Sequence, residues 1–205
     1  MNKEIRNIEG IEFRTIEEDG KKFIEGYALK FNSESKDLGG FREVVESDSI
    51  NDNTDLSDVV ALFNHSNMYV LARKNKEVDT LSLEVDSTGL KYRFEVDEEI
   101  SYIKDLYLNM KKGNISKSSF AFFLPSDGSG ERWEKVGNEY YRYITQFKKI
   151  SDVSPVTNPA YDNTTSMVRS FEEVKKELDK PLNESTGKEK STGEDYTYKF
   201  HLLKK

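Results

Sequence analysis

Two neighbouring segments with alternating apolar and polar residues constrain the fold of this 205-residue chain more than any other feature. Residues 89–96, Gly-Leu-Lys-Tyr-Arg-Phe-Glu-Val, alternate at every step, as a strand with one buried face requires. Residues 77–85 carry a similar pattern, and Asp86-Ser87-Thr88-Gly89 between them is rich in turn-forming residues. The sequence therefore predicts an antiparallel hairpin with one face in the core.

Further patterns predict a mainly β fold with two flanking helices, of the α+β class. Residues 23–31 and 132–147 are strand-like, the latter broken at Gly137-Asn138. The first helix is predicted to be capped by Asp97 and to end at Lys111-Lys112-Gly113, with an apolar stripe of Ile100, Ile103, Tyr107 and Met110. The second carries Met167, Phe171, Val174 and Leu178 at helical spacing and stops before Pro181.

The length and the C-terminal composition predict one domain followed by a tail. A chain of 205 residues is long enough for one domain with a real core. Residues 183–195 contain no apolar residue, which is typical of disorder. We therefore expect a domain over residues 1–180 and a polar, disordered tail over residues 181–205.

Charge and composition argue against several classes of function. The net charge of -7 is unfavourable for a general nucleic-acid binder, which needs a surplus of Lys and Arg. The chain has no cysteine, so disulfides and thiolate metal sites are not expected. No apolar stretch approaches the length of a membrane span, and the charged first residues do not resemble a signal peptide. We expect a cytoplasmic protein that binds neither nucleic acid nor membrane.

Three segments contain residues suited to nucleophilic catalysis. His65 ends the apolar run 59–65, and an imidazole is the side chain best suited to take a proton from serine near neutral pH. On a strand over residues 117–124, Ser118 shares the apolar face, whereas Ser119 points to the other face, where a substrate could reach it. Asp152 supplies a carboxylate that could orient the imidazole. From the residues alone, a structural histidine and a turn-starting aspartate remain the commoner interpretations.

Several blocks, in this order, resemble the prohead (procapsid) maturation proteases of tailed bacteriophages, a serine-peptidase family related in fold to the herpesvirus assemblins. The resemblance covers roughly residues 20–170. The blocks are Gly-Tyr-Ala-Leu-Lys-Phe (26–31), Gly-Phe-Arg-Glu (40–43), Leu-Phe-Asn-His (62–65), Val-Leu-Ala-Arg (70–73), Thr-Leu-Ser-Leu (80–83) with Gly-Leu (89–90), Ser-Phe-Ala-Phe (119–122) and Asp-Val-Ser-Pro-Val-Thr-Asn-Pro-Ala-Tyr (152–161).

The resemblance implies a fold and a site. The fold would be a closed or nearly closed herpesvirus-protease-like β-barrel surrounded by helices. The family's histidine, serine and acidic residue fall on His65, Ser119 and Asp152, where relatives commonly have glutamate at the third position. Ala121 and Ala72 also stand where the family usually has glycine.

The resemblance also implies a function. It predicts a serine endopeptidase that cleaves scaffolding protein and major capsid protein inside the assembling procapsid, in the host cytoplasm, without a metal or cofactor. Cleavage of the chain by itself and formation of a homo-oligomer are compatible with this prediction. Two alternatives stay open: a proteolytically inactive capsid-assembly or scaffolding protein that keeps the protease fold, and an unrelated β-rich binding module in which His65 is structural.

Overall fold

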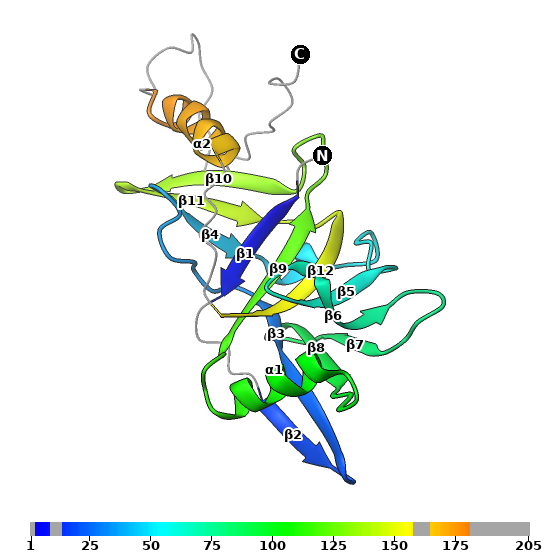
Figure 1. The fold of residues 1–205 in the computed structure, drawn as a ribbon. Coiled ribbons are helices and arrows are strands. Elements are labelled where there is room, and N and C mark those ends of the chain that lie inside the picture. Colours follow the sequence, from blue (N-terminus) through cyan, green and yellow to red (C-terminus); the bar gives the residue numbers. More distant parts are fainter. Residues whose placement is uncertain (1–2, 9–13, 158–164, 181–205) are drawn as a thin grey trace.

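The described part of the chain consists of three β-sheets and two α-helices (Figure 1). The computed structural model describes residues 3–8, 14–157 and 165–180. The five-stranded sheet contains β1 (Glu4–Ile8), β9 (Lys117–Phe123), β12 (Lys149–Val156), β5 (Val59–Phe63) and β6 (Ser66–Lys74), in that spatial order. The four-stranded sheet contains β2 (Arg14–Glu18), β3 (Lys21–Lys30), β8 (Gly89–Glu95) and β7 (Leu81–Val85). The three-stranded sheet contains β10 (Glu131–Val136), β11 (Glu139–Ile144) and β4 (Arg42–Val45).

The four-stranded sheet contains the predicted hairpin. β7 pairs antiparallel with β8, and Asp86 Oδ1 closes their turn by accepting hydrogen bonds from the N–H groups of Thr88 and Gly89 at 2.7 and 3.0 Å. The hairpin is confirmed, although β7 begins at Leu81 rather than at residue 77. A Cβ at Gly89 would lie 1.9 Å from the carbonyl oxygen of Leu29 on β3, so the close approach of β3 and β8 requires glycine there.

The first predicted helix is present but starts later than the sequence suggested. Helix α1 spans Ser101–Lys111 with Ile100 at its N-cap, so the predicted capping by Asp97 is wrong. Asp97 Oδ1 instead accepts a hydrogen bond from Glu99 N–H at 2.9 Å, in a turn that precedes the helix. The C-terminal prediction is confirmed, because Gly113 has a φ of +78° and donates its N–H to the Met110 carbonyl.

The three-stranded sheet packs against the second helix, α2 (Thr165–Leu178) (Figure 1). The break predicted at Gly137-Asn138 is the turn between β10 and β11. Phe171 of α2 is buried against Phe41, Trp133 and Tyr140 in a small core of its own. The helix ends at Leu178, before Pro181, as predicted. The predicted contribution of the Met167 side chain lies outside the residues described.

A larger core lies mainly between the other two sheets and α1. Its buried members include residues of β3 and β8, of β9 and β12, and of the helix face that carries Ile103, Leu106, Tyr107 and Met110, together with Val45 and Ile144 of the three-stranded sheet. The mainly β architecture with two helices is thus as predicted. Within the described ranges, however, the strands pair into three separate sheets, and no closed barrel is found.

Two segments near the N-terminus were not predicted as strands. β1 and β2 lie in charged sequence without clear alternation, so periodicity gave no signal for them. β1 forms one end of the five-stranded sheet and pairs antiparallel with β9. The candidate nucleophile is also on β9, which makes β1 important for the site.

No helix in the described portion of the chain is both long enough and apolar enough to cross a bilayer.

Candidate active site

His65 lies in the tight turn that joins β5 to β6. Phe63 pairs with Ser66, so Asn64 and His65 form a two-residue loop, with φ angles of 53° and 56°. Positive φ at both central residues is characteristic of a type I′ hairpin turn, in which asparagine is favoured. A positive φ is uncommon for residues other than glycine, although histidine is among those that adopt it, and such backbone conformations cluster at functional sites. The turn therefore sets the direction of the imidazole.

The turn is fixed to the end of β12. Asn64 donates its N–H to the Pro155 carbonyl at 3.0 Å, and its side-chain oxygen accepts a hydrogen bond from Thr157 N–H at 2.9 Å. Asp152 lies on the same strand, which runs parallel to β5. The backbone thus positions His65 and Asp152 relative to each other before any side-chain contact is considered.

The two adjacent serines of β9 point to opposite faces of the sheet, as predicted. Ser118 Oγ lies 3.3 Å from the hydroxyl of buried Tyr92 in the core, whereas Ser119 faces His65. Strand β9 runs between β1 and β12, so the Ser119 backbone pairs with Asn7 on one side and with Ser154 on the other.

The expectation that a substrate could reach Ser119 is wrong for the structure described. Ser119 is completely buried, with 0% of its surface exposed. Alternation along β9 predicts only the face of the sheet to which Ser119 points. It does not predict which strand pairs with the edge of β9, and β1 covers that edge. Ser119 Oγ also lies 2.8 Å from the carbonyl oxygen of Arg6 on β1.

The structure brings the three residues selected from the sequence into contact. His65 Nε2 lies 2.6 Å from Ser119 Oγ, and His65 Nδ1 lies 2.5 Å from Asp152 Oδ1. An Nδ1–H that donates to the carboxylate leaves the Nε2 lone pair facing the serine hydroxyl. Aspartate reaches the imidazole although its side chain is one methylene shorter than that of glutamate.

Asp152 is held as a buried carboxylate. Burial by itself raises its pKa, but the hydrogen bond and charge of His65, followed by the positive charge of Lys3, outweigh burial and lower the pKa. Ser154 Oγ donates to Asp152 Oδ1 at 3.0 Å. Asp152 Oδ2 lies 2.9 Å from Lys3 Nζ, an ion pair whose geometry is not that of a good hydrogen bond.

The serine hydroxyl has two acceptors and only one proton. His65 Nε2 and the Arg6 carbonyl oxygen are both within hydrogen-bonding distance of Ser119 Oγ. With Nδ1–H bonded to the carboxylate, the hydroxyl donates either to the imidazole or to β1. β1 therefore competes for the proton that a general base would have to remove.

Four further residues that were not predicted lie around these three: Lys3, Arg6, Asn64 and Ser154. Asparagine is a recognised turn residue, so Asn64 carried a usable signal in the sequence. Ser154 follows Asp152 by two positions on a strand and so shares its face, a second usable signal. Arg6 lies in β1 and Lys3 directly precedes it, and the sequence shows no pattern for this strand. In the part of the chain that is described, no group of three or more His, Asp or Glu side chains is placed to hold a metal ion.

Comparison with protein families identifies the chain. The model of the family described as caudovirus prohead serine protease matches residues 9–177, a range that includes His65, Ser119 and Asp152. Comparisons with curated proteins and with solved structures found no significant match. Because the family match spans well over half of the sequence, the chain belongs to the caudovirus prohead serine proteases.

Proposed function

We propose that this chain is a serine endopeptidase that cleaves scaffolding protein and major capsid protein inside the assembling procapsid, in the host cytoplasm. Membership of the prohead serine protease family supports a role in capsid maturation. The observation that carries the assignment of residues is the continuous chain of hydrogen bonds from Ser119 through His65 to Asp152.

In the proposed mechanism, Ser119 Oγ attacks the carbonyl carbon of the substrate peptide while His65 Nε2 accepts the hydroxyl proton. His65 then donates this proton to the leaving amine, and an acyl-enzyme on Ser119 remains. A water molecule, deprotonated by the same imidazole, hydrolyses the ester and restores the serine. In this second step His65 donates the proton that it took from water to Ser119 Oγ, so the enzyme ends in its starting protonation state.

Asp152 is assigned the role of orienting His65 and stabilising its positive charge. The lowered pKa of Asp152 supports this role, because the group stays ionised at neutral pH. An ionised carboxylate that accepts Nδ1–H selects the tautomer in which Nε2 is free to act as a base.

For the fold, we propose that the sheets correspond to an opened form of the herpesvirus-protease-like barrel. The core shared by the four-stranded and five-stranded sheets supports this correspondence. An experimental structure whose sheets superpose on those of a herpesvirus protease is the expected result. A different strand order would contradict it.

For the domain organisation, we propose that residues 1–180 form the protease domain and that residues 181–205 are a polar tail open to self-cleavage. Mass spectrometry after long incubation should show loss of the tail in the parent chain and an intact tail in Ser119→Ala. Equal processing of both chains would contradict self-cleavage.

One observation favours the alternative of an inactive assembly or scaffolding protein. Ser119 is completely buried beneath β1, and a serine in that state cannot meet a substrate. The alternative predicts that no cleavage depends on the candidate residues under any condition of assembly.

Co-expression with the cognate major capsid protein separates the two functions. We expect new N-termini on the capsid protein with the parent chain, and none with His65→Ala. The chain has only two histidines, so His201→Ala is a matched control that should cleave like the parent. Equal cleavage by all three chains would contradict the site, and no cleavage by any of them would favour the inactive protein.

A further inference from the structure

β1 occupies the edge of the five-stranded sheet beside the candidate nucleophile. It is the terminal strand of that sheet, so without it the edge of β9 would be unpaired next to Ser119. Extended peptides commonly bind proteins by adding a strand to such an edge. β1 thus lies where a substrate strand would bind.

The backbone of β1 presents one carbonyl to the nucleophile. Asn7 pairs with Ser119, and the oxygen of the preceding carbonyl, that of Arg6, lies 2.8 Å from Ser119 Oγ. In a bound substrate, the carbonyl closest to the nucleophile belongs to the residue before the scissile bond. Arg6 is therefore the residue of β1 that occupies this position.

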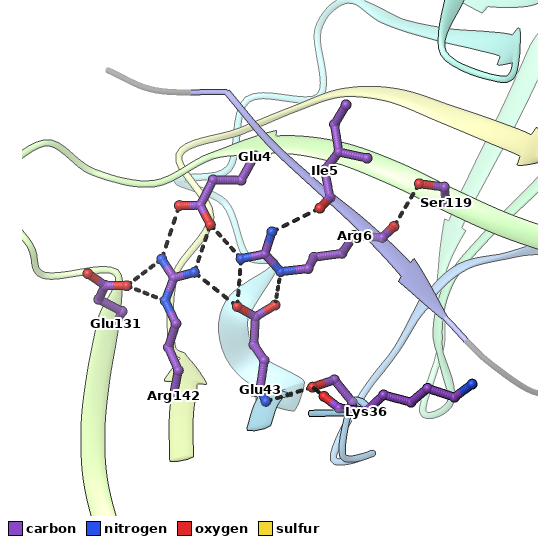
Figure 2. Close-up of polar contacts among 9 residues, drawn as sticks. Glu4, Ile5, Arg6, Lys36, Glu43, Ser119, Glu131 and Arg142 are labelled. Carbon is purple, nitrogen blue, oxygen red and sulfur yellow. Dashed lines mark hydrogen bonds and ion pairs between the residues drawn. The ribbon is translucent and has the colours of Figure 1, made fainter. Parts of the chain in front are cut away.

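The Arg6 side chain is bound by a buried carboxylate. Its Nε and Nη2 lie 2.7 and 2.9 Å from the two oxygens of Glu43 on β4 (Figure 2). Glu43 is only 4% exposed. A bidentate pair of this geometry recognises a guanidinium specifically.

Two residues before Arg6 in β1, the Glu4 side chain is bound by a buried guanidinium, that of Arg142. Glu4 Oε2 and Oε1 lie 2.7 and 3.0 Å from Nη1 and Nη2 of Arg142 on β11. Arg142 is also paired with Glu131 at 2.5 Å and with Glu43 at 3.0 Å (Figure 2). These two carboxylates come from the three-stranded sheet, so Arg142 keeps acidic partners whether or not β1 is bound.

Together, Glu4, Arg6, Glu43, Glu131 and Arg142 form a cluster that we call the Arg–Glu cluster. Burying so many charges costs solvation energy, so ion pairs of this kind contribute more to register than to stability. A slip of β1 by one residue would turn both of its charged side chains to the other face of the sheet. The cluster thus selects the one register that places the Arg6 carbonyl at Ser119.

We propose, on the basis of the proposed function, that Glu43 and Arg142 are the specificity-determining residues of this protease. They select substrates with a basic residue immediately before the scissile bond and an acidic residue two positions earlier. β1 has this acidic–apolar–basic sequence and fills the same sites from within the chain. The family match begins at residue 9, after β1, so the matched region contains Glu43 and Arg142 without the strand that they bind.

A peptide assay with the full chain tests the selectivity without altering the protein. The probe is an internally quenched peptide that contains Lys-Glu-Ile-Arg-Asn-Ile, the sequence of residues 3–8. It is supplied up to millimolar concentration because it competes with tethered β1.

We expect cleavage of this peptide after the arginine. Replacing that arginine by alanine should lower kcat/KM by about 100-fold, the range for truncating a buried charge pair. Replacing the glutamate should lower kcat/KM by about tenfold.

A change in the protein tests the same contact from the other side. Glu43→Gln should reduce the preference for the arginine peptide over the alanine peptide to less than about tenfold. Glu139→Gln is a matched control on β11, because its side chain is 61% exposed and makes no contact with the cluster that the structure records. It should keep the full preference. If Glu43→Gln does not fold, the peptide series alone decides.

The outcomes distinguish this inference from the proposed function. Cleavage of the capsid protein that depends on Ser119, with equal rates on the arginine and alanine peptides or with no cleavage of either, would overturn the selectivity and leave the protease assignment intact. Absence of any Ser119-dependent cleavage of capsid protein and peptides would overturn both.

Discussion

The candidate triad of His65, Ser119 and Asp152 and the Arg–Glu cluster are both buried polar groups, and both meet β1. They differ in how their hydrogen bonds are satisfied. In the cluster, the carboxylate of Glu43 is paired with two guanidinium groups. In the triad, one hydroxyl proton is shared between two acceptors. The arrangement of the cluster suits it to hold a strand in place, whereas that of the candidate triad suits the proton transfer that the proposed function requires.

The strongest test of this contrast removes the charge from the triad but keeps its shape. Asp152→Asn should lower kcat by about 10⁴-fold, because an amide in place of the carboxylate favours the wrong tautomer of His65. Steady-state kinetics on a capsid-protein substrate would measure the loss. The free energy of unfolding should stay high enough for the variant to remain folded in the assay. A loss of rate that is explained entirely by unfolding of the variant would contradict the assignment.

The corresponding change in the cluster should act on stability. Glu43→Gln removes the carboxylate charge that compensates the buried guanidinium groups of Arg6 and Arg142, and we expect the free energy of unfolding to fall by about 3 kcal/mol. Denaturant titration would measure it, with Glu139→Gln expected within about 0.5 kcal/mol of the parent. A similar small effect for both variants would show that the cluster does not hold β1.

Acid should weaken the cluster through Glu4. Burial raises the pKa of Glu4, but Arg142 and then Arg6 outweigh burial and lower it from 4.5 to about 2. A lowered folded-state pKa adds stability that is present above the unfolded value and is lost as the pH falls from about 4.5 toward 2. The maximum contribution is about 3 kcal/mol, from 1.4 kcal/mol per pKa unit.

The variant Glu4→Gln isolates this contribution. The difference in unfolding free energy between the parent and Glu4→Gln should be largest above pH 5 and should narrow steadily below it. A difference that stays constant between pH 6 and pH 3 would mean that the Glu4 carboxylate is not paired in the folded chain.

The smallest expected effect concerns the turn that directs His65. Asn64→Ala places an alanine at a φ of 53° and removes the hydrogen bond to Thr157, so we expect a loss of about 1–2 kcal/mol. Asn64→Gly removes the same hydrogen bond but tolerates the backbone, and should lose about 1 kcal/mol less than alanine. Thermal unfolding of the two variants would measure the difference. Equal losses would show that the left-handed backbone is not under strain.

The sequence predicted those features of the fold and of the candidate site that depend on the periodicity of a single segment. The hairpin over β7 and β8 and the opposite directions of Ser118 and Ser119 follow from alternation within a single strand. The contact of His65 with Ser119 and Asp152 followed from family resemblance, because residues far apart in the chain leave no local signal. The contact of β1 with β9 joins segments more than 100 residues apart, and neither alternation nor resemblance indicated it.

Capping of helix α1 shows a different limit. Asp97 is a good N-cap residue by type, but it forms a turn with Glu99, and the helix starts at Ser101. An aspartate side chain can accept a backbone N–H hydrogen bond either in a turn or at a helix N-cap, so the residue type at position 97 does not decide between them. The burial of the helix face that begins at Ile103 then determines where the helix starts.

The most direct test compares the two neighbouring serines of β9 on one capsid-protein substrate. We predict that Ser119→Ala lowers kcat by at least about 10⁴-fold. Ser118→Ala, which loses only a core contact with Tyr92, should stay within about threefold of the parent after correction for stability. A Ser119→Ala chain that cleaves at the parent rate, or a loss confined to Ser118→Ala, would contradict the account.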